Sequence, residues 1–231
     1  IWRRPPLLWL LATFTVINFA STPVGVLVPL LLKFNLADDW TRNGFTFETA
    51  LALLNTLGSI GGLLGGVLIS VWGGLKKKRV YGVIIPIMLA GVAQIVYGLS
   101  PSILLTAAMS FAIVSLTPLM NAHSQTIWQT QVPRQLQGRV FSVRRVIAQF
   151  SAPVGTLIAG IAGASFNPGV ILSILGTITV VFALAQLFNP YLLKVEDKKY
   201  LDEVAVRRGE SPEALISAAE EPKIEQAVTQ S

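Results

Sequence analysis

The sequence contains no cysteine, a single histidine and few charged residues, and each shortage excludes a class of protein. Without cysteine there is no disulfide scaffold, no cysteine-ligated zinc or iron–sulfur centre and no cysteine nucleophile. One histidine cannot build a multi-histidine metal site. Only 13% of the 231 residues are charged, whereas a soluble globular domain carries about 25%. The composition therefore excludes a disordered chain and an ordinary soluble enzyme, and we expect no metal and no cofactor.

Long apolar runs take the place of the missing charge. Hydrophobic residues make up 52% of the chain, and one membrane-spanning helix needs about 20 mostly apolar residues. Barrel strands would alternate in polarity, but these runs are continuous. We predict an all-α membrane protein, with a six-span bundle over residues 1–192 and a partly disordered cytoplasmic tail over residues 193–231. The predicted spans are Leu7–Leu32, Thr49–Trp72, Val80–Leu99, Ile103–Ala122, Val140–Ala164 and Val170–Leu192.

The basic residues predict the orientation of these spans. Lys and Arg collect in the cytoplasmic loops of membrane proteins. Sixteen of the 18 Lys and Arg residues fall on the side that holds both termini, and the other side has only Lys33 and Arg42. Both termini are therefore expected in the cytoplasm. Because the basic residues flank spans, we expect membrane lipids rather than nucleic acid as their partner.

Acidic and polar residues give the first indication of a site. All 12 Asp and Glu residues lie outside the predicted span interiors, so no intramembrane carboxylate is present for proton coupling, and protons stay open as a coupling ion. His123 is expected to be a solvated residue at a helix end. Uncharged polar side chains inside spans line a cavity or bond neighbouring helices. The candidates for a substrate cavity, with the aromatic residues beside them, are Phe14, Asn18, Thr22, Asn55, Gln149 and Phe150.

Glycines recur four residues apart in the second span, and small residues do so in the fifth. Small residues at this spacing form a groove into which another helix packs closely. The predicted helix-packing positions are Gly58, Gly62, Gly66, Gly155 and Gly163.

The first and fourth spans each contain a Thr-Pro pair, Thr22-Pro23 and Thr117-Pro118. With the two glycine-rich spans in matching places, spans one to three echo spans four to six. Since the first span runs outward and the fourth inward, the two three-helix repeats are inverted in the membrane. Inverted repeats with Pro and Gly interruptions are typical of secondary transporters.

Motifs of other classes are missing. The sequence has no nucleophile elbow, no H-E-x-x-H and no P-loop. We therefore expect no enzyme. An alternative to the transporter interpretation is a six-span permease subunit that works as a homodimer or with a separate ATPase.

Two loop segments carry a family resemblance. Residues 66–79, GVLISVWGGLKKKR, resemble the cytoplasmic-loop motif G-x-L-x-D-R-x-G-R-[KR] of the major facilitator superfamily, with Ser70 at its acidic position. Residues 132–142, VPRQLQGRVFS, are similar to the V-P-x-x-x-x-G-R-V-x-S stretch of its macrolide-efflux and siderophore-exporter-like branch. The resemblance covers about residues 2–192.

This resemblance implies the C-terminal half, spans seven to twelve, of a 12-span transporter in a bacterial cytoplasmic membrane. The partners would be a missing N-terminal six-span half and a small amphipathic substrate, exported by alternating access. The start at Ile1 fits an incomplete chain. Gly74 and Gly138 are expected to permit tight turns. The residues assigned to gating by resemblance are Gly74, Lys76, Arg79, Pro133, Gly138 and Arg139.

Overall fold

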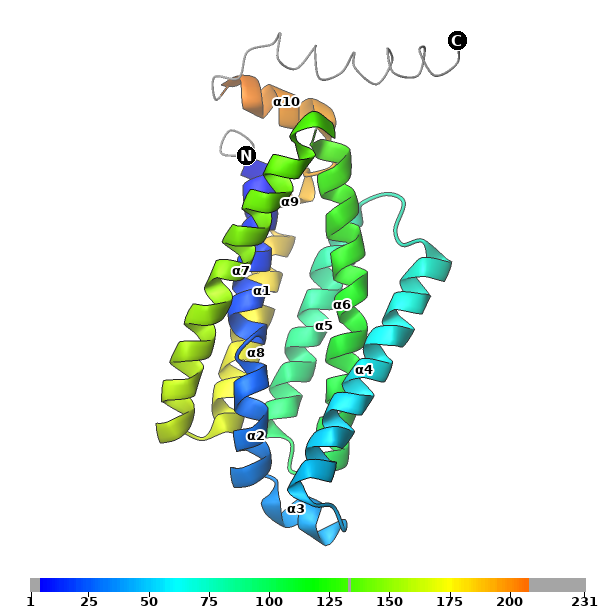
Figure 1. Ribbon diagram of the computed structural model, residues 1–231. Coiled ribbons are helices and arrows are strands. Elements are labelled where there is room, and N and C mark those ends of the chain that lie inside the picture. Colours follow the sequence, from blue (N-terminus) through cyan, green and yellow to red (C-terminus); the bar gives the residue numbers. More distant parts are fainter. Residues whose placement is uncertain (1–4, 133, 208–231) are drawn as a thin grey trace.

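Residues 5–132 and 134–207 are described by a computed structural model, and every regular element among them is a helix (Figure 1). The helices are α1 (Pro5–Ser21), α2 (Val24–Phe34), α3 (Ala37–Arg42), α4 (Phe47–Trp72), α5 (Arg79–Leu99), α6 (Ile103–Gln131), α7 (Arg134–Ser165), α8 (Pro168–Leu187), α9 (Pro190–Leu193) and α10 (Lys198–Arg207). Six segments are long and apolar enough to cross a membrane: α1 with α2, and α4 to α8 singly. The predicted all-α bundle of six spans is confirmed.

Some helix ends differ from the prediction. The fourth span, α6, continues through His123 to Gln131, so the predicted loop before Arg139 is largely helical. Polar residues do not terminate a helix; the break comes at Val132, because the residue before a proline disfavours the helical conformation. The last span ends at Leu187, earlier than predicted, and the Asn189 side chain caps the short α9 that follows.

The first span is broken at Pro23. Proline has no N–H to donate to the carbonyl four residues earlier, here that of Phe19. The helix therefore stops at Ser21 and restarts at Val24. Gly155 of α7 approaches the Phe19 carbonyl so closely that a Cβ there would lie 2.6 Å from the oxygen. In contrast, α6 continues through Pro118, so only one of the two Thr-Pro pairs interrupts its helix.

Several of the main helix pairings follow the inverted repeats. The main contacts are α4 with α6, α1 with α7, and α5 with both α6 and α8. Exchanging spans one to three with spans four to six turns the α1–α7 pair into the α6–α4 pair. The same exchange leaves the α5–α8 pair unchanged. Figure 1 shows α7 and α4 at opposite edges of the bundle, as this relation requires.

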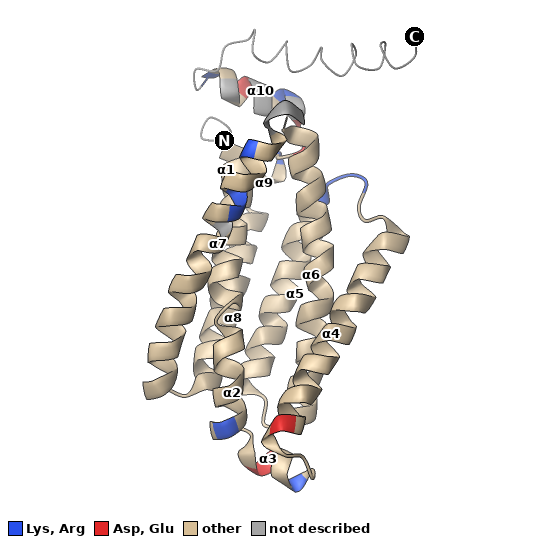
Figure 2. Ribbon diagram, viewed as in Figure 1, with Lys and Arg blue, Asp and Glu red and all other residues tan. Residues whose placement is uncertain are grey.

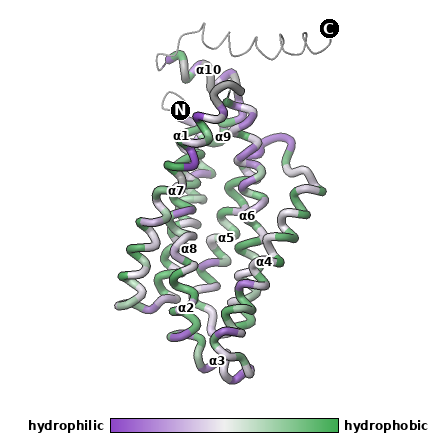
Figure 3. Tube along the Cα trace, in the orientation of Figure 1, coloured by the Kyte–Doolittle hydropathy of each residue, from purple (hydrophilic) through white to green (hydrophobic). Residues whose placement is uncertain are grey.

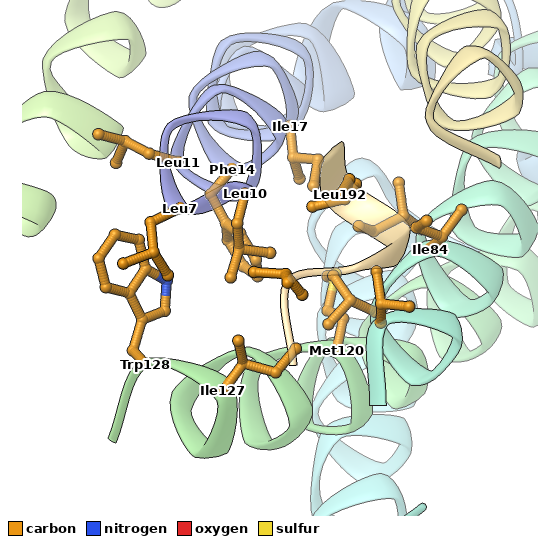
Figure 4. Packing of buried hydrophobic residues seen from close by; sticks show 14 of the residues in the cluster. Leu7, Leu10, Leu11, Phe14, Ile17, Ile84, Met120, Ile127, Trp128 and Leu192 are labelled. Carbon is orange, nitrogen blue, oxygen red and sulfur yellow. The ribbon is translucent and has the colours of Figure 1, made fainter. Parts of the chain in front are cut away.

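Two clusters of buried apolar side chains hold the bundle together. One lies toward the end where α1 begins and joins α1, α5, α6 and the segment after α8, with Trp128 and Leu192 fully buried (Figure 4). The other lies toward the opposite end and includes Leu31, Leu54 and Ile103. Each cluster draws on helices from both repeats, so neither repeat has a core of its own.

Polar groups mark the two ends of the bundle. Charged residues gather at these ends (Figure 2), and apolar residues cover most of the length between them (Figure 3). At the end that holds α3, the Asp39 carboxylate accepts a hydrogen bond from the backbone N–H of Ile103 at 2.6 Å. A carboxylate at a helix N-terminus also interacts favourably with the helix dipole. Asp39 therefore ties α3 to the start of α6.

Candidate functional site

The loop between α4 and α5, which resembles the superfamily motif, is held onto α6 by His123. The Leu75 backbone N–H donates to His123 Nε2 at 2.8 Å, and His123 Nδ1 lies 2.7 Å from the Leu119 carbonyl oxygen. Because a backbone N–H can only donate and a carbonyl can only accept, the imidazole is neutral with its proton on Nδ1. The His123 side chain is 3% exposed. The predicted solvated histidine is therefore wrong.

Two glycines make room for this imidazole. Gly74 has φ +71°, in the left-handed region that favours glycine, and a Cβ there would lie 2.8 Å from His123 Nε2. A Cβ at Gly82 of α5 would overlap the ring. The Trp72 ring lies 6.0 Å from the imidazole, centroid to centroid. The histidine thus sits in a slot formed by the loop and the start of α5.

The same loop has a second attachment, through Arg79. Its Nε donates to the Leu75 carbonyl at 3.2 Å, and its Nη1 lies 3.7 Å from a carboxylate oxygen of Glu196. Val195, next to Glu196, is fully buried against the core. Lys76, by contrast, is exposed. The loop is therefore tied both to α6 and to the segment that follows α9.

The second loop motif takes a different form from the one predicted. Gly138 and Arg139 lie inside α7 and are exposed, and a Cβ at Gly138 would meet nothing within 4 Å. Gly138 does not form a tight turn, because α7 begins before it, at Arg134. Pro133 lies outside the described residues. The gating role of these three residues stays a prediction.

Five of the six cavity candidates fall into two groups. On α1, Phe14 is buried and Asn18 is partly buried, and Thr22 is exposed just before the break at Pro23. On α7, Gln149 and Phe150 are exposed, Phe150 at 72%. Helix α7 is a neighbour of α1 and contacts it through Ser151 and Gly155. Successive helical residues turn by about 100°, so Gln149 and Phe150 lie away from this contact face.

Asn55, the remaining candidate, is exposed on α4, which packs mainly on α6. It therefore stands apart from the α1 and α7 candidates. A substrate cavity lined by all six candidates stays a prediction.

The glycines chosen from the sequence face other helices of the same bundle, with one exception. A Cβ at Gly58 would lie 2.9 Å from the Ser110 hydroxyl of α6, and one at Gly62 would lie 3.1 Å from Val114. A Cβ at Gly163 would lie 2.9 Å from Leu30 of α2. Gly66 has nothing within 4 Å of its Cβ position. Gly61 and Gly65, one residue off the chosen stripe, approach the α6 backbone most closely.

Sequence reasoning missed a second set of close contacts, between α5 and α8. Added Cβ atoms at Gly98 and Gly169 would each overlap the other residue's carbonyl oxygen. Gly91 and Gly176 form a similar pair about two helical turns further along. A Cβ added at Gly176 would lie 2.9 Å from the carbonyl oxygen of Gly91. The glycines are seven apart in each helix, a spacing that also returns to one helix face.

A further residue is Arg144, which the charge pattern grouped with the expected cytoplasmic basic residues. It lies inside α7, and its guanidinium contacts α1 and α6. Its position within the predicted span Val140–Ala164 was a signal available in the sequence.

Comparisons with known proteins add one relative. The chain is 26% identical over 204 residues to a protein of Bacillus subtilis (strain 168) named uncharacterized MFS-type transporter YvqJ. The alignment covers 87% of this chain and 46% of that protein, so the chain spans about half the length of this curated relative. No protein-family model and no solved structure matches the chain. The likeness agrees with a half-sized, MFS-like bundle, and the efflux branch stays a prediction.

Proposed function

We propose that this chain is the C-terminal half of a secondary active transporter that exports small amphipathic molecules from a bacterial cytoplasm by alternating access. It would be a transporter rather than an enzyme. Its partner would be an N-terminal six-span half, and both termini of this chain would lie in the cytoplasm.

The observation that carries this proposal is the pairing of the six spans. Inverted three-helix repeats, one of them with a broken helix, form the half-transporter unit in which a substrate site lies between two bundles. The relative, about twice as long and named a transporter, supports the same interpretation.

The exposed side of α4 and α7 also supports a second bundle. Large apolar side chains project from these two helices, among them Leu63, Val71, Phe150, Leu157 and Ile161. Lipid can cover such a surface, and so can six further helices. Because α4 and α7 are related by the repeat, a partner built in the same way would meet both.

Reconstitution of the chain with and without its N-terminal half tests the proposal. The two halves together are expected to move a fluorescent amphipathic dye across proteoliposomes under an imposed ion gradient, and the chain alone is expected not to. Transport by the chain alone would instead favour a homodimeric permease. A requirement for ATP and a separate ATPase would favour a permease subunit that works with that ATPase.

The cavity assignment is tested by Asn18→Ala and Gln149→Ala in the assembled transporter. Each removes one polar group that would orient an amphipathic ligand. Loss of one hydrogen bond, about 0.5–1.5 kcal/mol, corresponds to a two- to tenfold weaker apparent affinity. Transport kinetics measure the affinity and thermal unfolding measures stability, with Asn43→Ala in the outer loop as the control. Reduced stability with unchanged kinetics would show that these residues only join helices.

Single-cysteine variants test the orientation, and the chain has no native cysteine to interfere. Asn43 and Lys77 are both exposed and lie at opposite ends of the bundle. In intact cells a membrane-impermeant maleimide is expected to label Asn43→Cys and not Lys77→Cys. Lys77→Cys is expected to react only after permeabilisation. The reverse pattern would overturn the orientation.

A further inference from the structure

Arg144 is a half-buried cation between α7, α1 and α6, and no carboxylate of the described residues lies beside it. Its Nη1 donates to Gln125 Oε1 at 2.9 Å and its Nη2 donates to Ser124 Oγ at 3.0 Å. Both acceptors are neutral and belong to α6. Among the described residues, the ion pair between side chains is that of Arg79 with Glu196, and no described Asp or Glu neutralises Arg144.

Aromatic rings hold the guanidinium from two further directions. Its central carbon lies 5.2 Å from the ring centroid of Trp128 on α6 and 5.6 Å from that of Phe14 on α1. Such cation–π contacts partly offset the loss of hydration. The side chain therefore has a defined position between three helices, rather than the mobility of a surface arginine.

The position of Arg144 on α7 directs its side chain toward α1 and α6. It lies on the same face as Ser151 and Gly155, the small residues that contact α1. The next residue, Arg145, is rotated by about 100° and is exposed. Two adjacent arginines therefore have different surroundings, and only Arg144 points into the bundle.

Hydrogen-bond donors are left over at this place. A guanidinium has five N–H groups, and two of those of Arg144 are used within the described chain. Trp128 is fully buried, yet its Nε1 has no acceptor among the described residues. Figure 4 shows this nitrogen facing α1, on the side of Leu7 and Leu10. A buried donor without a partner is costly and calls for an explanation.

We propose that Arg144, with the Trp128 indole N–H beside it, binds the oxyanion group of a small organic anion or of a lipid headgroup. A partly buried charge is expected to have a partner. A carboxylate or phosphate would supply both the missing negative charge and acceptors for the unused N–H groups. Phe14 and Trp128 would flank the apolar part of the ligand. The role of this anion as the transported molecule rests on the proposed function, whereas its binding does not.

Binding is tested on the full chain in phosphatidylcholine nanodiscs, with benzoate as the anion and benzamide as its neutral counterpart. The ¹H–¹⁵N signal of the Trp128 indole, assigned by its loss in Trp128→Phe, reports on the site. Benzoate is expected to shift this signal in a saturable way, and benzamide is not. Arg144→Gln is expected to weaken benzoate binding at least tenfold, and Arg145→Gln by less than twofold. Arg144→Lys, which keeps the charge without the planar fork, is expected to fall between them.

A second series replaces part of the phosphatidylcholine with phosphatidylglycerol. If a lipid headgroup is the ligand, the Trp128 signal shifts with phosphatidylglycerol content in the wild type and in Arg145→Gln, but not in Arg144→Gln, and benzoate then competes. Either anion source supports the proposal. Equal responses of Arg144→Gln and Arg145→Gln, in variants that keep wild-type helix content, would overturn it. So would a wild type that responds to neither anion. Because no transport is measured, failure here leaves the proposed function standing, and loss of transport leaves the anion site standing.

Discussion

Gly65→Leu is expected to separate α4 from α6, whereas Gly66→Leu, one residue further on, is expected to leave the bundle folded. A Cβ at Gly65 would overlap the Ser115 carbonyl oxygen, but at Gly66 it would meet nothing within 4 Å. The conflict at Gly65 is with backbone, so no side-chain rotation relieves it. Overpacking a core side chain typically costs about 1–3 kcal/mol, and a displaced helix is expected to cost at least the upper value.

The two variants are matched in chemistry and in position along the helix. Both replace glycine by a stronger helix former, so any difference reports on packing. The measurement is the midpoint of thermal unfolding in detergent, followed by circular dichroism, with the monodisperse fraction after size-exclusion chromatography. Gly61→Leu is expected to behave like Gly65→Leu, because a Cβ there would overlap the Phe111 carbonyl. Equal midpoints for Gly65→Leu and Gly66→Leu would contradict the close crossing.

His123→Ala is expected to release the loop between α4 and α5. The substitution removes the acceptor of the Leu75 N–H and leaves a space beside Gly74 and Gly82. An unpaired donor costs about 1–3 kcal/mol, and truncation of a buried side chain adds a cavity term. We expect a total loss of about 2–4 kcal/mol, concentrated at the ends of α4, α5 and α6 that lie next to this loop.

Hydrogen exchange at the Leu75 amide measures this release directly. Its protection is expected to fall by at least tenfold in His123→Ala. Gly82→Ala is expected to act in the same direction, because the new Cβ would displace the imidazole. Asn121→Ala, at an exposed position of the same helix, is the control and is expected to change nothing. Unchanged protection in His123→Ala would show that the loop is held mainly by Arg79.

The attachment of the α4–α5 loop to α6 would give a gating role of this loop a physical basis. The α4–α5 loop is joined to α6 by His123 and to the segment after α9 by Arg79. A movement of α4 relative to α6 would have to break the first contact or carry it along. The acidic position of the superfamily motif holds Ser70, whose hydroxyl bonds to the Gly66 carbonyl of its own helix. His123 of α6 instead holds the loop at Leu75, five residues beyond Ser70.

The sequence by itself determined the number and type of the spans. Apolar content over about 20 residues is a local, additive property, so six helices could be counted without knowing how they pack. Proline was an ambiguous signal, because α1 stops before Pro23 whereas α6 continues through Pro118, and polarity did not mark the end of α6, which continues through His123. Neither proline nor hydropathy alone therefore located the helix ends.

Only the tertiary structure decided which side of each helix meets which neighbour. Gly65 and Gly66 are equivalent in the sequence, as are Arg144 and Arg145, yet one member of each pair faces another helix and the other does not. A rotation of about 100° per residue separates the two members of each pair. Contacts between segments far apart in the chain decide which of the two faces a neighbouring helix. The same contacts bury His123 and leave Gln149 exposed. Local composition carries no information about how each helix is turned about its own axis. The spans were therefore predictable, and the choice of neighbour for each helix face was not.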